Sequence, residues 1–195
     1  MKHPGLINSI KEHSIFEWSK KNINIINKIL KKYPSERKQS AVLPLLDIAQ
    51  RQNRGWLSKS AIEKVAFTLS MPIIRVTEVA TFYSMFNLRP IGKNFIQICR
   101  TTPCWLRGSK KLLEVAKNET GCALGETSKD NLFTLVEVEC LGACCNAPMV
   151  QINDNFYEDL DEKIFSNILQ KLKKNIKVNP GSQIGRNASE PFEGK

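Results

Sequence analysis

The segment NFIQICRTTPCWLRGSKKLLEVAKNE, residues 94–119, predicts a strand followed directly by a helix. Its first part, NFIQIC, is a short apolar run that ends at Cys99 and is typical of a buried strand. Beyond it the apolar residues recur at helical spacing, with Thr102 as the expected cap and Pro103 in the first turn. A strand that feeds a helix in this way indicates a layered fold in which helices cover a sheet.

The sequence after this segment predicts three more strands and a closing helix. The predicted strands are LFTLVEVEC, MVQIN and NFYED, and the helix is DEKIFSNILQKLKK. The order strand, helix, strand, strand, strand, helix is typical of an α/β sandwich with a mixed four-stranded sheet. Residues 178–195 contain Pro, Gly and Ser but few apolar side chains, and predict an extended tail.

Upstream of residue 91 the pattern is helical and predicts a small helical bundle. Ser19 can cap the first helix, and Ser60 with Glu63 can form the capping box of a later one. The expected fold class is therefore α+β. The predicted divisions are a helical bundle over 1–90, an α/β domain over 91–177 and a tail over 178–195.

The composition describes an ordinary globular protein with a formal charge of +10. The lysines are scattered over the polar sides of amphipathic segments, which favours a solvated surface over a nucleic-acid patch. Apolar runs such as AVLPLL are too short to span a bilayer, and MKHPGLINSIKEH lacks the apolar core and cleavage site of a signal peptide. We therefore expect a cytosolic chain without direct membrane insertion.

Six cysteines in a cytosolic chain indicate metal or redox chemistry, because the cytosol keeps thiols reduced and disfavours disulfides. The only histidines are His3 and His13, which we expect at the surface. Few histidines are therefore available to act as the base of a Ser–His or Cys–His nucleophile system, and we predict no catalytic residue.

Four of the cysteines form two pairs, each beginning at the carboxyl end of a predicted strand. Cys99 and Cys104 have four residues between them, and Cys140 and Cys144 have three. Neighbouring strands can bring these four soft ligands to one edge of the sheet, where they would hold an iron–sulfur cluster or a structural zinc. The wide loop CRTTPC favours a binuclear iron cluster, with zinc and unrelated buried cysteines as alternatives.

The residues around the pairs suggest how a negatively charged site is stabilised. Cys104 lies in the first turn of a predicted helix, where free N–H groups favour a thiolate. Arg100, Arg107 and the backbone amides of Gly142 and Ala143 are candidates to stabilise added charge. Gly142 also lets the backbone turn closely around a ligand.

Two cysteines remain outside the pairs. Cys145 directly follows Cys144, and the side chains of consecutive residues leave the backbone in different directions. We therefore do not expect the two cysteines to bind the same cluster. Cys122 and Cys145 are therefore predicted to be packing residues or free thiols.

Several long motifs resemble the family of E subunits of the proton-pumping NADH-quinone oxidoreductases, respiratory complex I. The resemblance extends from about Phe16 to Pro191 and includes the tail QIGRNASEP. It is carried by CRTTPCWLRGS, GETSKDNLFTLVEVECLGACCNAPMVQINDNFYEDL, AVLPLLDIAQRQ, GWLS and IRVTEVATFYSMFNLRPIGK. The resemblance implies an N-terminal helical bundle and a thioredoxin-like domain carrying one [2Fe-2S] cluster. Its ligands would be Cys99, Cys104, Cys140 and Cys144.

The resemblance also implies a function and partners. The chain would exchange single electrons with the flavin of a flavin- and NADH-binding subunit, beside other subunits of the peripheral arm, on the cytoplasmic side of the inner membrane. It would be part of an enzyme only within the complex. The alternatives are the equivalent subunit of an NAD-linked hydrogenase or formate dehydrogenase and, remotely, a zinc-stabilised basic nucleic-acid-binding module.

Overall fold

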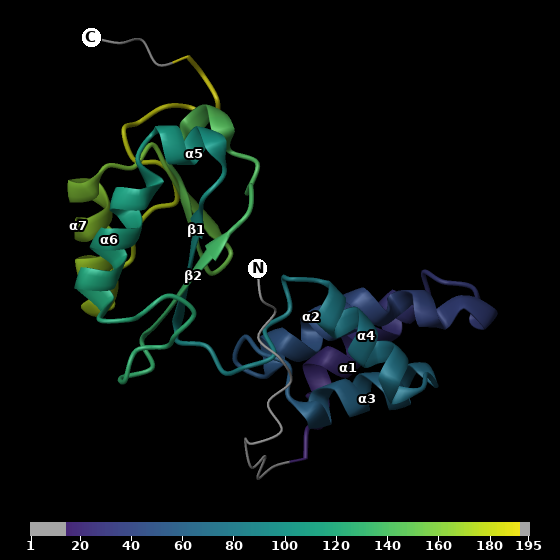
Figure 1. Ribbon diagram of the computed structural model, residues 1–195. Helices are drawn as coiled ribbons and strands as arrows, with labels where there is room; N and C mark the ends of the chain where they lie inside the picture. Colours follow the sequence, from purple (N-terminus) through teal and green to yellow (C-terminus); the bar gives the residue numbers. More distant parts are fainter. Residues whose placement is uncertain (1–14, 192–195) are drawn as a thin grey trace. The chain divides into compact units, whose positions relative to one another are not determined.

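The structure is a computed structural model that describes residues 15–191 (Figure 1). The chain divides after Pro90 into two compact units, Met1–Pro90 and Ile91–Lys195, each with its own hydrophobic core. His3 and His13, predicted to be surface residues, lie outside the described residues. No helix between residues 15 and 191 combines the length and the apolar character needed to cross a membrane.

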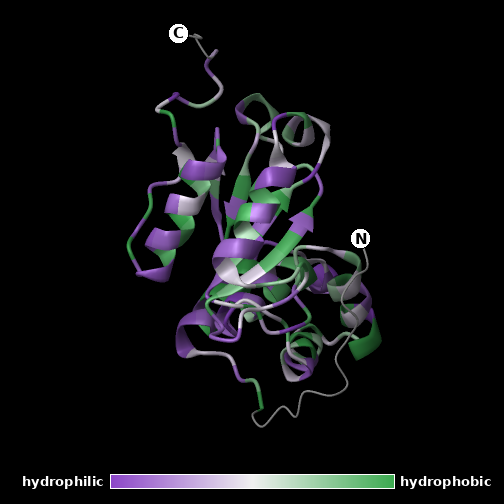
Figure 2. Ribbon diagram, turned by 60° about the vertical axis from the view of Figure 1, so that its left-hand side comes forward, coloured by the Kyte–Doolittle hydropathy of each residue, from purple (hydrophilic) through white to green (hydrophobic). Residues whose placement is uncertain are grey.

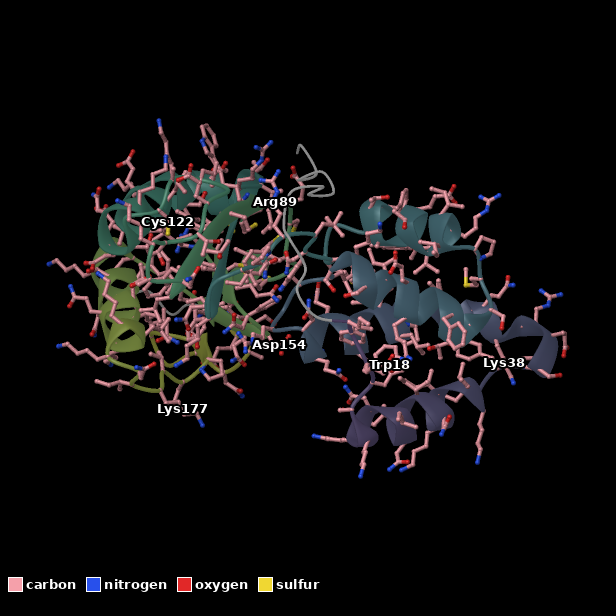
Figure 3. The ribbon with its side chains drawn as sticks, turned by 90° about the horizontal axis from the view of Figure 1, so that it is seen from below. Trp18, Lys38, Arg89, Cys122, Asp154 and Lys177 are labelled. Atoms are coloured by element: carbon pink, nitrogen blue, oxygen red, sulfur yellow. The ribbon has the colours of Figure 1, made fainter. Side chains whose placement is uncertain are left out.

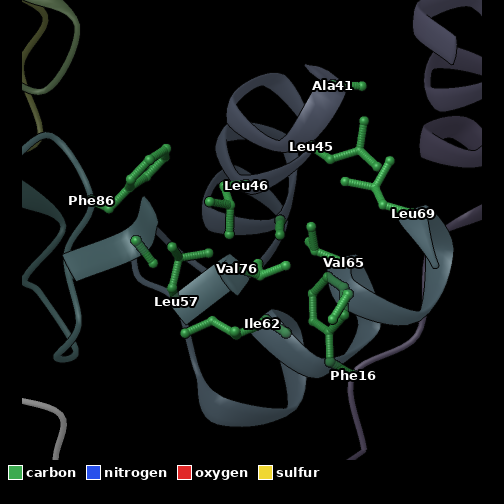
Figure 4. Close-up of a cluster of buried hydrophobic side chains, with 14 of the residues drawn as sticks. Phe16, Ala41, Leu45, Leu46, Leu57, Ile62, Val65, Leu69, Val76 and Phe86 are labelled. Carbon is green, nitrogen blue, oxygen red and sulfur yellow. The ribbon is translucent and has the colours of Figure 1, made fainter. Parts of the chain in front are cut away.

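The first unit is a helical bundle, as predicted. Its elements are α1 (Lys20–Leu30), the 3-10 helix η1 (Ser35–Ala41), α2 (Val42–Gln52), α3 (Lys59–Leu69) and α4 (Ile73–Phe82). The apolar stripes of these helices face one another and form the core, in which Leu45, Leu46, Val65 and Val76 are buried together (Figure 4). The apolar residues whose spacing predicted the helices therefore also form the surface through which the helices pack.

One of the two predicted helix caps in this unit is correct and the other is wrong. Ser19 caps α1, because its hydroxyl accepts a hydrogen bond from the Asn22 amide at 3.2 Å. The α3 cap is Ser58 rather than Ser60: the Ser58 hydroxyl accepts from the Ala61 amide at 3.1 Å, so Ser60 lies inside the first turn. Ser58 has the extended backbone of a cap residue, whereas Ser60 is helical.

The second unit contains a mixed sheet of five strands, one more than predicted. The strands are β1 (Asn94–Cys99), β2 (Phe133–Val138), β3 (Val150–Ile152), β4 (Asn155–Glu158) and β5 (Gly181–Ser182), in the order β2-β1-β3-β4-β5. β1 runs parallel to β2 and antiparallel to β3. β1, which lies between β2 and β3, is buried along most of its length, as its apolar sequence predicted.

The fifth strand lies within residues 178–195, for which the sequence predicted an extended tail but no strand. Gly181 and Ser182 pair in parallel with Tyr157 and Glu158 of β4. An uncovered edge strand presents unpaired N–H and C=O groups, which this part of the tail satisfies. A two-residue strand is too short to show any periodicity in the sequence.

Three helices accompany the sheet: α5 (Thr102–Leu106), α6 (Ser109–Thr120) and α7 (Glu162–Lys173). α6 and α7 lie side by side against the sheet (Figure 1), and buried residues of both helices belong to the core of this unit. Figure 2 shows hydrophilic and hydrophobic residues alternating along the helices. The single helix predicted over residues 101–119 is broken at Gly108, whose φ of +98° is left-handed, and the cap of α5 is Thr101 rather than Thr102. Glycine tolerates this conformation because it has no side chain.

Cys122 lies inside the core of the second unit (Figure 3). Its thiol is 3.7 Å from the carbonyl of Phe133 and makes a weak hydrogen bond to it. Cys122 was predicted to be a packing residue or a free thiol, and in the structure it is a free thiol packed in this core.

Candidate functional site

The four paired cysteines lie at one edge of the sheet. β1 ends at Cys99, Cys104 follows in α5, Cys140 comes two residues after β2, and Cys144 begins the 3-10 helix η2 (Cys144–Asn146). Because β1 and β2 are parallel, their carboxyl ends meet at the same edge, and Cys99 pairs in register with Val138. The sheet topology therefore explains how two pairs that are far apart in the sequence approach one another.

The first pair is buried. Cys99 and Cys104 are each 1% exposed and pack with Ala147 and Met149. The Cys99 sulfur lies 3.3 Å from the Thr101 hydroxyl, and the Met149 amide donates a hydrogen bond to the sulfur of Cys104. This side of the site is closed to solvent.

The second pair is exposed, and its two sulfurs are in contact. The Sγ atoms of Cys140 and Cys144 are 3.5 Å apart, and the Gly142 amide donates to the Cys140 sulfur at 3.4 Å. Gly142 has a φ of +88°, so the close turn predicted between the two cysteines is present. The Ala143 carbonyl accepts a hydrogen bond from the amide of Asn146.

Hydrogen bonds and charge interactions join the two pairs. The Thr101 hydroxyl interacts with the sulfurs of both Cys99 and Cys140, and the Leu141 amide donates to Cys99. Negative charge on Cys99 also acts on Cys144. The structure therefore brings all four predicted site cysteines together.

In each pair, the pKa of one cysteine is lowered and the pKa of the other is raised. Burial raises the pKa of Cys104 to about 12. Burial also opposes ionisation of Cys99, but the hydrogen bonds from Thr101 and the Leu141 amide outweigh it and lower the pKa of Cys99. The Gly142 amide lowers the pKa of Cys140, and the hydrogen bond with Cys140 raises the pKa of Cys144. Thiolates rather than thiols bind metal, so metal binding must release the protons that these cysteines carry.

The donor set fits a binuclear iron–sulfur cluster. Within residues 15–191, no three His, Cys, Asp or Glu side chains converge closely enough to hold one metal ion together. The sulfurs are instead arranged as two pairs, and a binuclear cluster requires two thiolates on each iron. A ligand set of soft thiolates, without imidazole or carboxylate, also suits an iron–sulfur cluster.

The remaining predicted residues lie around these pairs. Arg100 forms an exposed ion pair with Glu139 at 3.6 Å. Arg107 lines an open pocket of about 520 Å³ together with Cys144 and Cys145. The thiol of Cys145 is free and exposed, and its backbone carbonyl accepts a hydrogen bond from Arg186.

Sequence reasoning missed Thr101 and Arg186. Thr101 is close to Cys99 in the sequence, but the local pattern favours the neighbouring Thr102 as the helix cap. Arg186 lies in the predicted tail, where no local pattern connects it to a cysteine 41 positions earlier.

Comparison with known proteins gives a consistent result. The family model described as thioredoxin-like [2Fe-2S] ferredoxin matches residues 26–173. The chain is 57% identical over 158 residues to the E subunit of NADH-quinone oxidoreductase from Rickettsia bellii (strain RML369-C), covering 81% of this chain and 95% of that protein. It is 50% identical over 184 residues to the mitochondrial NADH dehydrogenase [ubiquinone] flavoprotein 2 of Dictyostelium discoideum, covering 94% of this chain and 74% of that protein.

A solved structure with a similar fold is that of an NAD+-reducing [NiFe]-hydrogenase in the H2-reduced state. Its TM-score is 0.61 at 22% sequence identity, and the match covers 69% of this chain and 23% of that one. At this identity the likeness concerns the fold alone.

Proposed function

This chain belongs to the thioredoxin-like [2Fe-2S] ferredoxin family and is a relative of the E subunits of NADH-quinone oxidoreductase, and from that membership we propose that it is the electron-transfer subunit of an NADH-oxidising module in respiratory complex I. The observation that supports the proposal most directly is the meeting of two cysteine pairs at the carboxyl ends of adjacent parallel strands. A [2Fe-2S] cluster bound there supplies one-electron redox chemistry, which the protein side chains lack.

We propose as cluster ligands the four paired cysteines, Cys99, Cys104, Cys140 and Cys144. The contacts of Cys140 with Cys144 and of Cys99 with Cys104 support this set, because each pair could supply two thiolates to one iron. Backbone amides and the Thr101 hydroxyl donate hydrogen bonds to these sulfurs and stabilise negative charge on them. Ala147 and Met149 exclude water from the buried pair.

The arrangement also suggests where electrons enter and leave. Cys140 and Cys144 are exposed, and so are the apolar side chains of Trp105 and Leu106 on α5, next to the buried Cys104. We propose that a flavin- and NADH-binding subunit approaches this part of the unit and that other peripheral-arm subunits bind elsewhere, on the cytoplasmic side of the inner membrane. The chain itself would not bind nucleic acid and would not insert directly into the membrane.

Three measurements test the proposal: colour, metal content and the electron paramagnetic resonance spectrum. Protein purified without oxygen should be reddish, contain two irons per chain and give a rhombic electron paramagnetic resonance signal after strong reduction. A colourless protein with stoichiometric zinc would refute the cluster assignment.

The partner is tested by affinity purification from the native cells. Recovery with a flavoprotein and further iron–sulfur subunits supports the proposed module. Recovery with a hydrogenase or a formate dehydrogenase would instead assign the chain to the equivalent subunit of those enzymes. The identity of 57% to a relative from NADH-quinone oxidoreductase favours the first outcome.

A further inference from the structure

Arg186, in the C-terminal tail, is almost completely buried and forms hydrogen bonds in three directions. Its side chain is 9% exposed. It donates to both carboxylate oxygens of Asp159 at 2.8 and 3.1 Å and to the carbonyl of Glu190 at 2.9 Å. Its remaining bond, at 2.8 Å, goes to the carbonyl of Cys145. One guanidinium thus connects the tail, the end of β4 and the cysteine loop.

The partner carboxylate is equally well satisfied. Asp159 is 7% exposed and also accepts a hydrogen bond from the Ser182 hydroxyl at 2.7 Å. Removing two charges from water is costly unless each is paired and fully hydrogen-bonded, and loss of one partner leaves the other uncompensated. Arg186 and Asp159 therefore hold a fixed geometry rather than a fluctuating surface contact.

A second buried side chain fixes the same loop. Asn146, the last residue of η2, is 3% exposed and donates to the Glu158 carboxylate and to the Ala188 carbonyl, each at 2.7 Å. Its own carbonyl accepts from the Asp159 amide at 2.8 Å. Both residues that follow Cys144 are therefore attached to β4 and the tail.

We propose that Arg186 is a positioning residue of the cluster site, which acts through the Cys145 carbonyl to fix the orientation of the Cys144 sulfur. The C-terminal tail is then a structural part of the metal centre. This inference rests on the proposed role of Cys140 and Cys144 as ligands. The physical reason is that Cys144 is exposed and lies in a three-residue turn, which has no strand or long helix of its own to hold it.

The test uses the full chain loaded with its cluster and compares Arg186→Gln, Arg186→Lys and Asp159→Asn with the unaltered protein. The matched control is Arg75→Gln, which removes an arginine from an exposed ion pair with Glu78 in the helical unit. The readouts are the electron paramagnetic resonance spectrum of the reduced cluster, the rate of cluster loss to an iron chelator, and the unfolding temperature. All rates are measured well below that temperature.

We expect Arg186→Gln and Asp159→Asn to lose the cluster about ten- to a hundredfold faster, the range for residues that support metal ligands. Their spectra should be shifted or broadened, whereas Arg75→Gln should match the unaltered protein. Arg186→Lys should be intermediate, because lysine keeps the charge but cannot reproduce the bidentate fork.

Unchanged spectra and loss rates in Arg186→Gln would overturn the inference, even with a lower unfolding temperature, since that result means a structural role only. If Arg186→Gln does not fold, Arg186→Lys becomes the test variant. The inference is then overturned if Arg186→Lys has the spectrum and the rate of cluster loss of the unaltered protein. Absence of an iron–sulfur spectrum in the unaltered protein is a different result, because it overturns the proposed function itself.

Discussion

The Thr101 side chain interacts with sulfurs of both cysteine pairs. Hydrogen bonds to cluster sulfurs stabilise the more negative, reduced state. Thr101→Val keeps the shape and removes the hydroxyl, so the reduction potential should become more negative by about 20–40 mV, equivalent to roughly 0.5–1 kcal/mol.

A redox titration followed by electron paramagnetic resonance measures this potential. Thr102→Val is the matched control, because it makes the same change one residue further along. An equal shift in both variants would contradict the specific role of Thr101.

The ligand assignment makes a prediction for each cysteine. A serine at a ligand position provides a harder oxygen donor and should abolish or strongly alter the visible spectrum. The spectrum should be preserved when the free thiols are replaced. The variants expected to change the spectrum are C99S, C104S, C140S and C144S, and the controls are C122S and C145S. A normal spectrum in C144S together with an altered one in C145S would mean that Cys145 is the ligand.

At the scale of elements, the sheet begins with an unusually close contact between Gly92 and β2. A β-carbon on Gly92 would lie 2.7 Å from the backbone carbon of Phe133, a distance that real contacts do not allow. Gly92→Ala should therefore force the strands apart and lower the free energy of unfolding by about 1–3 kcal/mol. Chemical denaturation of the protein measures the change.

Gly121→Ala is the control for this prediction. Nothing lies within 4 Å of the position of its β-carbon, so its cost comes from the left-handed backbone at φ +66° alone, about 1 kcal/mol. A smaller effect for Gly92→Ala than for Gly121→Ala would show that the strands adjust freely.

α6 and α7 are joined by Glu119. Its carboxylate accepts hydrogen bonds from Ser166 and Gln170 and forms an ion pair with Lys173 at 3.0 Å, and the hydrogen bond from Ser166 contributes most to lowering its pKa. Because the folded pKa is lowered, the stabilisation is complete above the pKa of the unfolded chain and is lost as the pH falls through the folded value.

Glu119→Gln should therefore reduce stability at pH 7 by about 0.5–1 kcal/mol and by progressively less as the pH falls below about 4. Unfolding curves recorded between pH 3 and pH 7 test this dependence. Glu114→Gln, on the same helix, serves as the control, and a difference for Glu119→Gln that does not change with pH would contradict the argument.

At the scale of the whole molecule, the two units have separate cores, and the candidate metal centre belongs entirely to the second. A ligand stabilises the folded state that binds it. Removing the cluster should therefore reduce amide hydrogen-exchange protection in β1, β2 and η2 far more than in α2 and α3. Equal loss of protection in both units would show that they unfold together.

Local patterns in the sequence were enough to predict most elements of each unit and the pairing of the cysteines. Apolar periodicity predicted the helices of the bundle, and the short apolar runs predicted four of the five strands. The spacing of the cysteines at the ends of NFIQIC and LFTLVEVEC indicated a four-thiol site. Periodicity and spacing can be recognised in the sequence because they depend on residues close together along the chain.

The hydrogen bonds that surround the site, in contrast, could be identified only in the folded structure. The contacts of Thr101 with Cys140, of Met149 with Cys104 and of Arg186 with Cys145 join segments far apart in the sequence. Such contacts depend on strand order and on the return of the tail to β4, for which a single sequence carries no local pattern. Local chemistry indicated the candidate ligand atoms, whereas long-range packing determined which hydrogen bonds surround them.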